Sequence, residues 1–355
     1  MEIKITKTKK SKIHEVDMNN IPFGQVFSDH MFVADYKNGE WINAEIKPVE
    51  NLSLHPANLA LHYGQSVFEG MKASVKRDGT PCLLRPEMHA KRINLSAERM
   101  CMPAIPEELF LEALHKLVGL DSDWIPPHDG SALYIRPYMF ATDEYLGVRP
   151  SKSYKFIILT LPVGPYYTKP VSLKAETQYV RAAHGGVGEA KAAGNYAASL
   201  YPAKKAVEEG FDQVLWLDAK EFKYVQEVGT MNIFFVIDDV VVTPQTDGTI
   251  LKGITRDSFI TIFKDHGYKV EERLVSIDEI FEAAEQEKLS EVFGAGTAAV
   301  VSKVHKIHHD GREINLDTKS YKVADLAYDI ITGLRNGTVE DKYDWIVPVE
   351  VLEAV

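Results

Sequence analysis

The stretch that most constrains this chain is residues 185–199, GGVGEAKAAGNYAAS, where one lysine stands among residues with very small side chains. The glycines at its start permit positive φ angles and a tight turn. The alanines and the glycine around Lys191 leave free volume in which a bulky ligand could lie against the backbone. We expect Asn195 to cap an alanine-rich helix that ends before Gly210. The segment therefore predicts a turn that presents Lys191 just before a helix.

A lysine in such a turn is suited to covalent chemistry. To form a Schiff base with an aldehyde cofactor, its amine must reach a carbonyl carbon from a fixed position. The alternative is an ordinary solvated lysine beside a helix start, because lysines are mostly exposed. Residues elsewhere in the chain decide between the two.

The length of 355 residues exceeds the usual size of a single hydrophobic core, so we expect two domains. The best candidate for a linker is the stretch GPYYTKPV at 164–171, which combines two prolines with a glycine and two tyrosines. We therefore predict an N-terminal α/β domain at 1–165, a linker at 166–174 and a C-terminal domain that carries the lysine at 175–355.

Composition and charge disfavour several classes of protein. Hydrophobic residues make up 45% and charged residues 26% of the chain, as in ordinary globular proteins. The net charge of −11 disfavours nucleic acid and anionic membrane as partners, and no apolar run approaches the roughly 20 residues of a membrane helix. Two well-separated cysteines and an opening stretch without a secretory pattern lead us to expect a reducing, cytoplasmic location.

Hydrophobic periodicity predicts helices and strands along both halves. One helix is expected from Pro86 to about Met100, with a stripe formed by Met88, Arg92, Leu95 and Arg99. Arg92 would lie beside apolar neighbours, where it either binds an anion or covers apolar surface with its stem. Further helices are expected at 106–120, 254–267 and 277–286, the last capped by Ser276. Strands are expected at 22–36, 131–140, 155–163, 212–218, 222–238 and 240–245, with turns at Asn38–Gly39 and Asp238–Asp239.

Two glycine turns are candidate anion sites. Gly253, Ile254 and Thr255 open a helix, so backbone N–H groups and the positive end of the helix dipole point to one place. A second turn, Gly294–Thr297, could aim amides at an anion in the same way. The chain has no Gly-Lys-Ser or Gly-Lys-Thr triplet, so neither turn is a P-loop. The histidines of 305–309 precede an Asp-Gly turn and are interpreted as part of an exposed hairpin, with no metal site predicted.

Six segments together resemble one family. They are LHYGQSVFEGMKA, LRPEMHAKR, YIRPY, GGVGEAKAAGNYAAS, QEVGTMNIF and GAGTAAVV. Their order and spacing, from about Phe23 to about His305, resemble the branched-chain amino acid aminotransferases, class IV enzymes of fold type IV that use pyridoxal 5′-phosphate (PLP). The resemblance implies an α+β or α/β fold of two domains, a smaller N-terminal and a larger C-terminal one, with the site at their interface. It also implies reversible amino transfer between L-leucine, L-isoleucine or L-valine and 2-oxoglutarate.

The resemblance assigns the residues that hold the cofactor. Lys191 matches the lysine that forms the Schiff base and then moves a proton at the substrate Cα. Glu227 matches the carboxylate that faces the pyridine nitrogen, and Tyr196 the tyrosine that hydrogen-bonds the phenolic oxygen. Arg92 matches the phosphate-binding arginine. The remaining matched cofactor positions are Thr230, Ile254, Thr255 and Thr297.

The resemblance also assigns a substrate pocket. The matched positions are Phe23, Tyr63, Phe68, Tyr134, Arg136, Thr230, Thr297 and Ala298. The four aromatic residues would form walls that receive a branched side chain, with weak discrimination among the three substrates. Thr297 and Ala298 would meet the substrate carboxylate. Arg136 with Tyr63 would receive the second carboxylate of glutamate or 2-oxoglutarate.

Assembly and the rival functions follow from the same comparison. Family members form homodimers whose sites borrow residues from the partner, and Tyr63 and the loop at 145–148 match the borrowed segments. Animal-type relatives carry a CxxC pair where Ala299 and Ser302 stand here, which excludes thiol regulation at that place.

A D-amino acid aminotransferase or an aminodeoxychorismate lyase would keep the same cofactor residues. A non-catalytic protein that binds a phosphate-bearing ligand would use the glycine turns but would have no use for Lys191.

Overall fold

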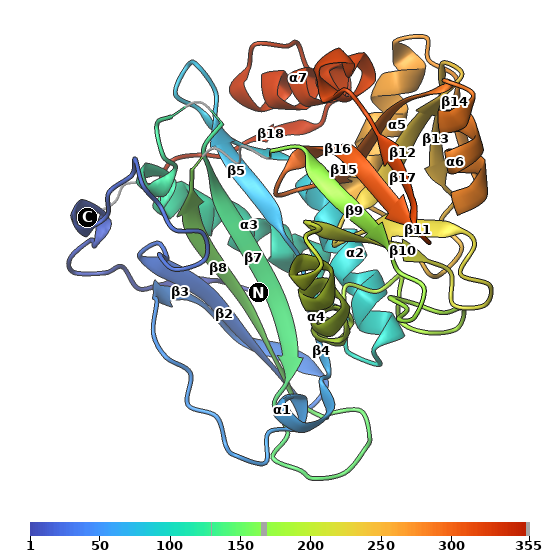
Figure 1. The fold of residues 1–355 in the computed structure, drawn as a ribbon. Helices are drawn as coiled ribbons and strands as arrows, with labels where there is room; N and C mark the ends of the chain where they lie inside the picture. The colour runs from blue at the N-terminus through green and yellow to red at the C-terminus, as the bar shows by residue number, and fades with distance from the viewer. Residues whose placement is uncertain (129, 165–168, 353–355) are drawn as a thin grey trace. The chain divides into compact units, whose positions relative to one another are not determined.

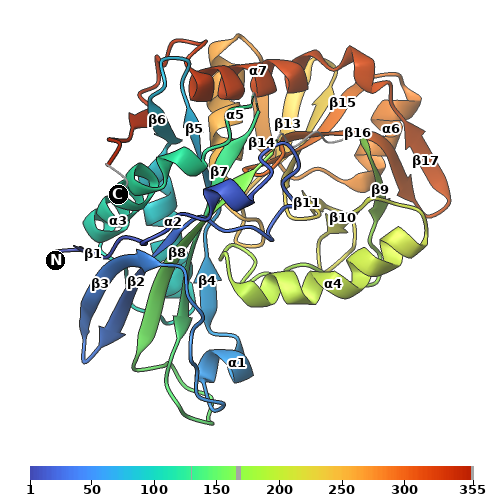
Figure 2. The same cartoon turned by 90° about the vertical axis from the view of Figure 1, so that its left-hand side faces the viewer.

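The computed structural model describes residues 1–128, 130–164 and 169–352. The chain forms two compact units that are discontinuous in sequence, and their elements are labelled in Figures 1 and 2. The first unit comprises residues 1–166, 190–193 and 332–355, and the second comprises residues 167–189 and 194–331. Each unit contains helices and is built on a sheet of its own.

This division differs from the domains predicted from the sequence. Residues 165–168, which include the predicted boundary and the first part of the predicted linker, lie outside the described residues. The last part of that linker belongs to strand β9 (Val171–Ala175). The lysine segment 190–193 and the C-terminal residues 332–355 join the first unit, which is therefore the larger of the two.

The first unit holds a nine-stranded sheet with the order β1-β3-β2-β8-β7-β5-β6-β18, to which β4 adds by pairing with β7. Its strands are β1 (Lys4–Ile5), β2 (His30–Lys37), β3 (Glu40–Pro48), β4 (Ser66–Phe68), β5 (Met71–Val75), β6 (Pro81–Leu84), β7 (Ala132–Ala141), β8 (Tyr154–Val163) and β18 (Ile346–Pro348). β1 and β3 run parallel, and the other named pairs are antiparallel. The hairpin from β2 to β3 turns at Asn38 and Gly39, both with positive φ, as the Asn-Gly pair predicted.

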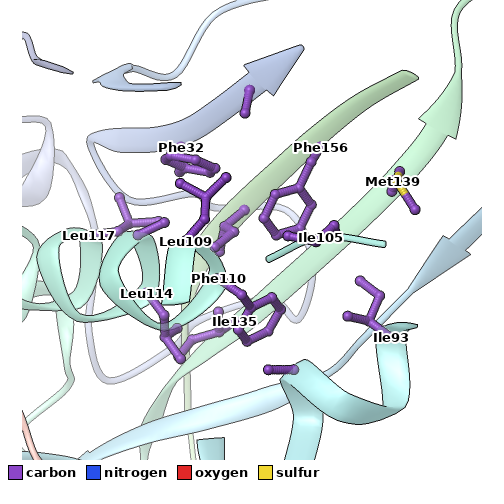
Figure 3. Close-up of a cluster of buried hydrophobic side chains, with 14 of the residues drawn as sticks. Phe32, Ile93, Ile105, Leu109, Phe110, Leu114, Leu117, Ile135, Met139 and Phe156 are labelled. Carbon is purple, nitrogen blue, oxygen red and sulfur yellow. The ribbon is translucent and has the colours of Figure 1, made fainter. Parts of the chain in front are cut away.

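The helices of the first unit pack on one face of this sheet. They are α1 (Leu59–Tyr63), α2 (Pro86–Arg99) and α3 (Glu107–Leu120), with short 3-10 helices η1 (Ile13–Glu15) and η2 (Ser122–Trp124). Figure 3 shows the core between α3 and the sheet, where Phe110 stacks on Phe156 with ring centroids 5.9 Å apart and Ile135 lies buried nearby. Because side chains alternate along a strand, Tyr134 and Arg136 of β7 point to the opposite face. The core thus directs the predicted site residues of β7 away from the helices.

The second unit holds another nine-stranded sheet, with the order β11-β10-β9-β16-β15-β12-β13-β14 and with β17 paired to β16. Its further strands are β10 (Gln213–Leu217), β11 (Val225–Val228), β12 (Asn232–Ile237), β13 (Val240–Pro244), β14 (Val270–Arg273), β15 (Leu289–Gly296), β16 (Val300–His309) and β17 (Arg312–Asn315). The β12–β13 hairpin turns at Asp238 and Asp239, both with positive φ, where the sequence predicted a turn. The histidine-rich stretch lies in β16, which leads into the hairpin turn at Asp310 and Gly311.

Helices cover both faces of the second sheet. They are α4 (Ala193–Glu208), α5 (Ile254–Asp265), α6 (Ile277–Glu285) and α7 (Lys322–Asn336), with the 3-10 helix η3 (Thr318–Ser320). Phe234 of β12 packs against Phe259 and Phe263 of α5, whereas the next residue, Phe235, lies in the core with α6. The predicted Ser276 cap of α6 is confirmed, since its side chain accepts from the Glu279 N–H. In the part of the chain that the structure describes, no helix has both the length and the apolar character needed to span a membrane.

One predicted strand in the first half was wrong in extent. The strand expected at 22–36 begins at His30, because the preceding residues form turns that include Gly24 at φ +78°. The apolar segment at 59–75 is divided into α1, β4 and β5, because Gly64 ends α1 in the left-handed conformation.

Candidate functional site

The backbone around Lys191 is fixed within the first unit by β4 and α2. Ala192 forms a β-bridge with Val67, and the Phe68 N–H donates to the Lys191 carbonyl at 3.1 Å. The Lys191 N–H donates to Ser96 Oγ at 2.9 Å. The alanines on either side of the lysine are buried. Small neighbours therefore let this segment lie against β4, and Lys191 lacks the freedom of an ordinary surface lysine.

The Lys191 side chain lies over an aromatic ring. Its Nζ is 4.7 Å from the centroid of the Phe68 ring. The Arg136 guanidinium lies 4.8 Å from the same centroid, and its Nη2 donates to the Tyr134 hydroxyl at 3.0 Å. Phe23, which is 55% exposed, meets Tyr134 edge-on with ring centroids 5.7 Å apart. The first unit thus brings together five predicted site residues, two of them cationic and three aromatic.

Gly70 leaves the space that the Tyr134 hydroxyl occupies. A Cβ atom built on Gly70 would lie 2.3 Å from that hydroxyl oxygen, far inside van der Waals contact. Gly70 precedes β5, and Tyr134 pairs with Lys72 in the adjacent strand register. The glycine is therefore required for the aromatic wall to take this position.

Tyr63, the remaining predicted aromatic wall, lies at the end of α1 and is 43% exposed. The loop after β7 is tied to α1 by backbone hydrogen bonds, since the Leu59 N–H donates to the Asp143 carbonyl and the Tyr145 N–H to the Ala57 carbonyl. The exposed large apolar side chains of α1 and this loop are Leu61, Tyr63, Tyr145, Leu146 and Val148. They lie on two segments of the first unit that these hydrogen bonds hold together.

Arg92 is held by a carboxylate that the sequence analysis did not single out. Its Nε donates to Glu69 Oε1 at 2.7 Å and its Nη2 to Glu69 Oε2 at 2.8 Å, which makes a bidentate pair. His89 Nδ1 lies 2.7 Å from the same Oε2, and the Gly70 N–H donates to it at 3.2 Å. Glu69 has no exposed surface, and Arg92 and His89 are 9% and 3% exposed. The guanidinium is therefore fixed in one orientation.

The charges in this cluster determine its protonation. Burial alone would raise the pKa of the Glu69 carboxyl, but Arg92 and His89 together hold that pKa far below its usual range. Burial lowers the pKa of His89, and the positive charges of Arg92 and Lys191 lower it further, against the opposing effect of Glu69. At neutral pH the cluster is thus a carboxylate, a guanidinium and a neutral imidazole that donates from Nδ1.

The stripe predicted for α2 was wrong. It grouped Arg92 with Leu95, but Leu95 is 59% exposed. The buried residues of α2 are Pro86, His89, Ala90, Arg92, Ile93, Ser96 and Ala97. His89, Arg92 and Ser96 follow one another at helical spacing on this face. Polar residues at that spacing were the sequence signal from which the Glu69 cluster and the contact of Ser96 with Lys191 could have been predicted.

Glu227, in β11 of the second unit, is 3% exposed and held at both oxygens. The Leu251 N–H donates to Oε1 at 2.8 Å, and Asn232 Nδ2 lies 3.4 Å from the same oxygen. Arg181 Nε lies 3.1 Å from Oε2, in the geometry of an ion pair rather than a hydrogen bond. The carboxylate is thus buried, paired and fixed in direction.

The first predicted anion turn is confirmed as a helix start. Gly253 is the N-cap of α5 without a side-chain cap, and Ile254 and Thr255 are its first two residues. A Cβ on Gly253 would lie 1.9 Å from Asn232 Oδ1, so only glycine fits there. The first turn of α5 therefore presents backbone amides and the positive end of the helix dipole, as an anion site requires.

The second predicted turn was wrong in its position. Gly294 and Gly296 belong to β15, and the turn follows at residues 297–299, which include Thr297 and Ala298. Cβ atoms on either glycine would lie 3.0 Å from the Met231 side chain, so close packing explains these glycines better than a turn does. Thr230 lies, exposed, in the turn between β11 and β12.

The cap predicted for the helix after Lys191 was also wrong. α4 begins at Ala193, so Asn195 lies inside its first turn, where Asn195 Nδ2 donates to the Val187 carbonyl at 2.8 Å. The helix end before Gly210, at φ +89°, is confirmed. Tyr196 lies half-buried in the same first turn.

Comparison with known proteins identifies the family. The family model for amino-transferases of class IV matches residues 66–307. The chain belongs to the class IV aminotransferases. This confirms the family expected from the sequence motifs.

Relatives of this class IV aminotransferase match nearly its whole length. It is 46% identical to branched-chain-amino-acid aminotransferase 2 of Bacillus subtilis, over 99% of this chain and 98% of that one. It is 49% identical to branched-chain-amino-acid transaminase 1 of the same organism, over 94% and 95%. The solved branched-chain amino acid aminotransferase of Escherichia coli is 28% identical with a TM-score of 0.73, over 92% and 99%. The branched-chain aminotransferase of Thermoproteus uzoniensis, solved with norvaline, is 26% identical with a TM-score of 0.73, over 90% and 99%.

Proposed function

We propose that this protein is a branched-chain amino acid aminotransferase that uses PLP to move an amino group between L-leucine, L-isoleucine or L-valine and 2-oxoglutarate. The observation that carries the proposal is the fixed Lys191, whose ammonium lies 4.7 Å from the Phe68 ring centroid while β4 and α2 hold its backbone. The relatives named above, at 46% and 49% identity, support the same activity.

The described residues fit PLP. The glycine start of α5 supplies amides for a phosphate, and Glu227 is a buried carboxylate of the kind that keeps a pyridine nitrogen protonated. Arg92, with Ile254, Thr255 and Thr297, would bind the phosphate, while Tyr196 would donate to the phenolic oxygen and Thr230 would line the same site. When bound, PLP supplies a ring that withdraws electrons from the substrate Cα.

Lys191 would hold the cofactor covalently and then carry a proton to and from the substrate Cα. A positioned base of this kind contributes about 10²- to 10⁴-fold to the rate. The Phe68 ring would keep the Lys191 amine in place, since a cation over an aromatic face is attracted by the ring quadrupole. The fixed backbone removes the need to order this segment during each cycle.

On the substrate side, Phe23, Tyr63, Phe68 and Tyr134 would enclose the branched side chain. Thr297 and Ala298 would meet the substrate carboxylate. Arg136 would receive the second carboxylate of 2-oxoglutarate, because its guanidinium is held by Tyr134 and lies over the Phe68 ring.

A second copy of this chain would cover the apolar surface formed by Leu61, Tyr63, Tyr145, Leu146 and Val148. Val148 is 87% exposed and Leu146 is 62% exposed, so burial of these apolar side chains against a partner would be favourable. We propose that the enzyme works as a homodimer whose partner covers this surface, and in the cytoplasm, where its two free cysteines would stay reduced.

Two measurements test the function. Turnover of L-leucine with 2-oxoglutarate should yield glutamate, whereas D-alanine and aminodeoxychorismate should react poorly. Mass mapping after borohydride reduction should locate the pyridoxyl group on Lys191, and Lys191→Ala should still bind PLP, less tightly, without completing a cycle. No glutamate from L-leucine would refute the activity, and near-normal turnover in Lys191→Ala would remove this lysine from its role.

A further inference from the structure

Arg181, a largely buried arginine, ties three segments of the second unit together. Its Nη2 donates to the carbonyls of Gly188, at 3.1 Å, and of Thr249. Its Nε lies 3.1 Å from Glu227 Oε2, and its side chain is 9% exposed. Because a guanidinium is planar and rigid, these contacts fix where its positive charge lies relative to the carboxylate.

The carbonyls that hold Arg181 are themselves closely packed. A Cβ atom on Gly188 would lie 2.5 Å from the Thr249 carbonyl oxygen and 2.3 Å from the Ala182 Cβ, so the two backbones approach as closely as glycine allows. Both acceptors of Nη2 therefore belong to one rigid arrangement.

The other oxygen of Glu227 is held from the opposite side. The Leu251 N–H donates to it at 2.8 Å, and Asn232 Nδ2, which also donates to the Leu251 carbonyl at 3.0 Å, lies 3.4 Å away. A carboxylate held at each oxygen by a different segment keeps one direction without relying on its own rotamer.

We propose that Arg181 is a positioning residue that orients the Glu227 carboxylate and keeps it ionised. The inference rests on the proposed function, in which Glu227 faces the ring nitrogen of PLP. A carboxyl group buried this deeply would favour its neutral form without a positive partner. Beside Arg181 it stays charged and is a weaker base, so a proton shared with the ring nitrogen remains on the nitrogen. Arg181 itself forms no bond with cofactor or substrate.

The test compares Arg181→Gln, Arg181→Lys and the wild-type protein, with Arg273→Gln as the control. Arg273 belongs to the same unit and also contacts a backbone carbonyl, that of Leu274, and a glutamate, Glu279, but it lies in β14, away from the predicted site residues. Two quantities are measured: the Kd of the apoprotein for PLP, and the midpoint of the pH titration of the bound PLP absorption spectrum.

We expect Arg181→Gln to weaken PLP binding by about 10- to 100-fold, as for loss of the charged partner of a buried carboxylate, and to shift the titration midpoint by about one pH unit or more. Arg181→Lys should fall between Arg181→Gln and the wild type. Arg273→Gln should lower the unfolding temperature but change neither quantity. An unchanged Kd and midpoint in Arg181→Gln, or equal changes in Arg273→Gln, would overturn the proposal.

If Arg181→Gln does not fold, the double variant Arg181→Gln/Glu227→Gln, which leaves neither charge unpaired, is compared with Glu227→Gln alone. Since Arg181 acts through Glu227, the two should share one titration midpoint, and a further shift in the double variant would overturn the proposal. Failure of the proposed function is distinguishable, because the wild-type protein would then bind no PLP.

Discussion

A glutamate–arginine pair lies near a predicted site in each unit, Glu69 with Arg92 in the first and Glu227 with Arg181 in the second, and the two pairs are built in opposite senses. In the first unit Glu69 has no exposed surface and takes two donors from Arg92, so the carboxylate holds the arginine. In the second unit Arg181 is anchored to two carbonyls and approaches Glu227, so the arginine holds the carboxylate. The residue assigned to bind the cofactor is therefore the arginine, Arg92, in the first unit and the glutamate, Glu227, in the second.

The difference shows how a protein can keep a charged side chain available to a ligand in a buried site. A buried charge is costly unless it is paired, so each ligand-facing group needs a partner of opposite sign behind it. An anionic phosphate calls for a guanidinium backed by a carboxylate, and a protonated ring nitrogen calls for a carboxylate backed by a guanidinium. The first pair is held mainly by side chains, including His89, with one backbone donor from Gly70, whereas the second is held mainly through backbone groups.

The largest effect that would sharpen this comparison is expected from Glu69→Gln. Removal of one partner leaves Arg92 buried beside a neutral side chain, which should lower the free energy of unfolding by about 3–5 kcal/mol. Chemical denaturation of the apoprotein measures the change. Glu112→Gln, which affects an exposed ion pair with Lys116, is the control and should change stability by about 0.5 kcal/mol or less. Equal effects of the two variants would show that the Glu69 pair contributes nothing special.

The second effect concerns rate rather than stability. Glu227→Gln should lower kcat by about 10²- to 10³-fold, the range expected when one preorganised electrostatic partner is lost. Stability should fall less than in Glu69→Gln, because Arg181 keeps two carbonyl acceptors and a glutamine oxygen still accepts from Leu251. Steady-state kinetics and denaturation of the same preparation measure the change in rate and the change in stability separately. A variant that loses stability but retains its rate would invert the comparison.

Between pH 5 and pH 8, a change of stability with pH is expected from His89, which contacts Glu69 of the first pair. Because the pKa of His89 is lowered in the folded state, the unfolded state binds more protons below its ordinary value of 6.5. The stability that neutral His89 contributes is thus fully present above about pH 6.5 and is lost as pH falls below it. The difference in unfolding free energy between wild type and His89→Gln should be constant from pH 7 to 8 and shrink toward pH 5. A constant difference across that range would contradict the assignment.

The smallest effect is expected beside the first pair, at Gly70. In Gly70→Ala the added methyl group must displace the Tyr134 hydroxyl, and with it the hydrogen bond from Arg136. We expect KM for 2-oxoglutarate to rise by about 10-fold, with a smaller change for L-leucine. Gly164→Ala, where the added Cβ meets open space, should leave both KM values unchanged. Equal KM values for wild type and Gly70→Ala would show that Tyr134 and Arg136 move without consequence.

Local signals in the sequence predicted much of the secondary structure. Pro86 at the start of α2, Gly253 before α5 and Ser276 before α6 act through the conformations and hydrogen bonds of the nearest few residues, so the sequence contains the whole cause. The Asn38–Gly39 hairpin belongs to the same group. The strong resemblance in six motifs then predicted the family.

What the sequence could not supply were contacts between distant segments. Glu69 meets Arg92 and His89 across 23 and 20 residues, and Lys191 meets Ser96 across 95, distances over which periodicity carries no information. Asn195 was expected to cap a helix, but its Nδ2 donates to the Val187 carbonyl, because the segment before the helix folds back. The roles assigned to individual site residues remain predictions that the experiments above address.

The membership of residues 190–193 in the first unit has a consequence for any attempt to express one half of the chain alone. A polypeptide that stops at residue 164 would lack both the strand that pairs with β6 and Ala192, which forms a β-bridge with Val67 of β4. A polypeptide that starts at residue 169 would carry Lys191 without the Phe68 ring beside its amine and without the Ser96 hydroxyl that accepts from its backbone N–H. The segments of the two units are interleaved along the chain, so exchange of either half with that of a distant relative would leave the lysine beside neighbours from another protein.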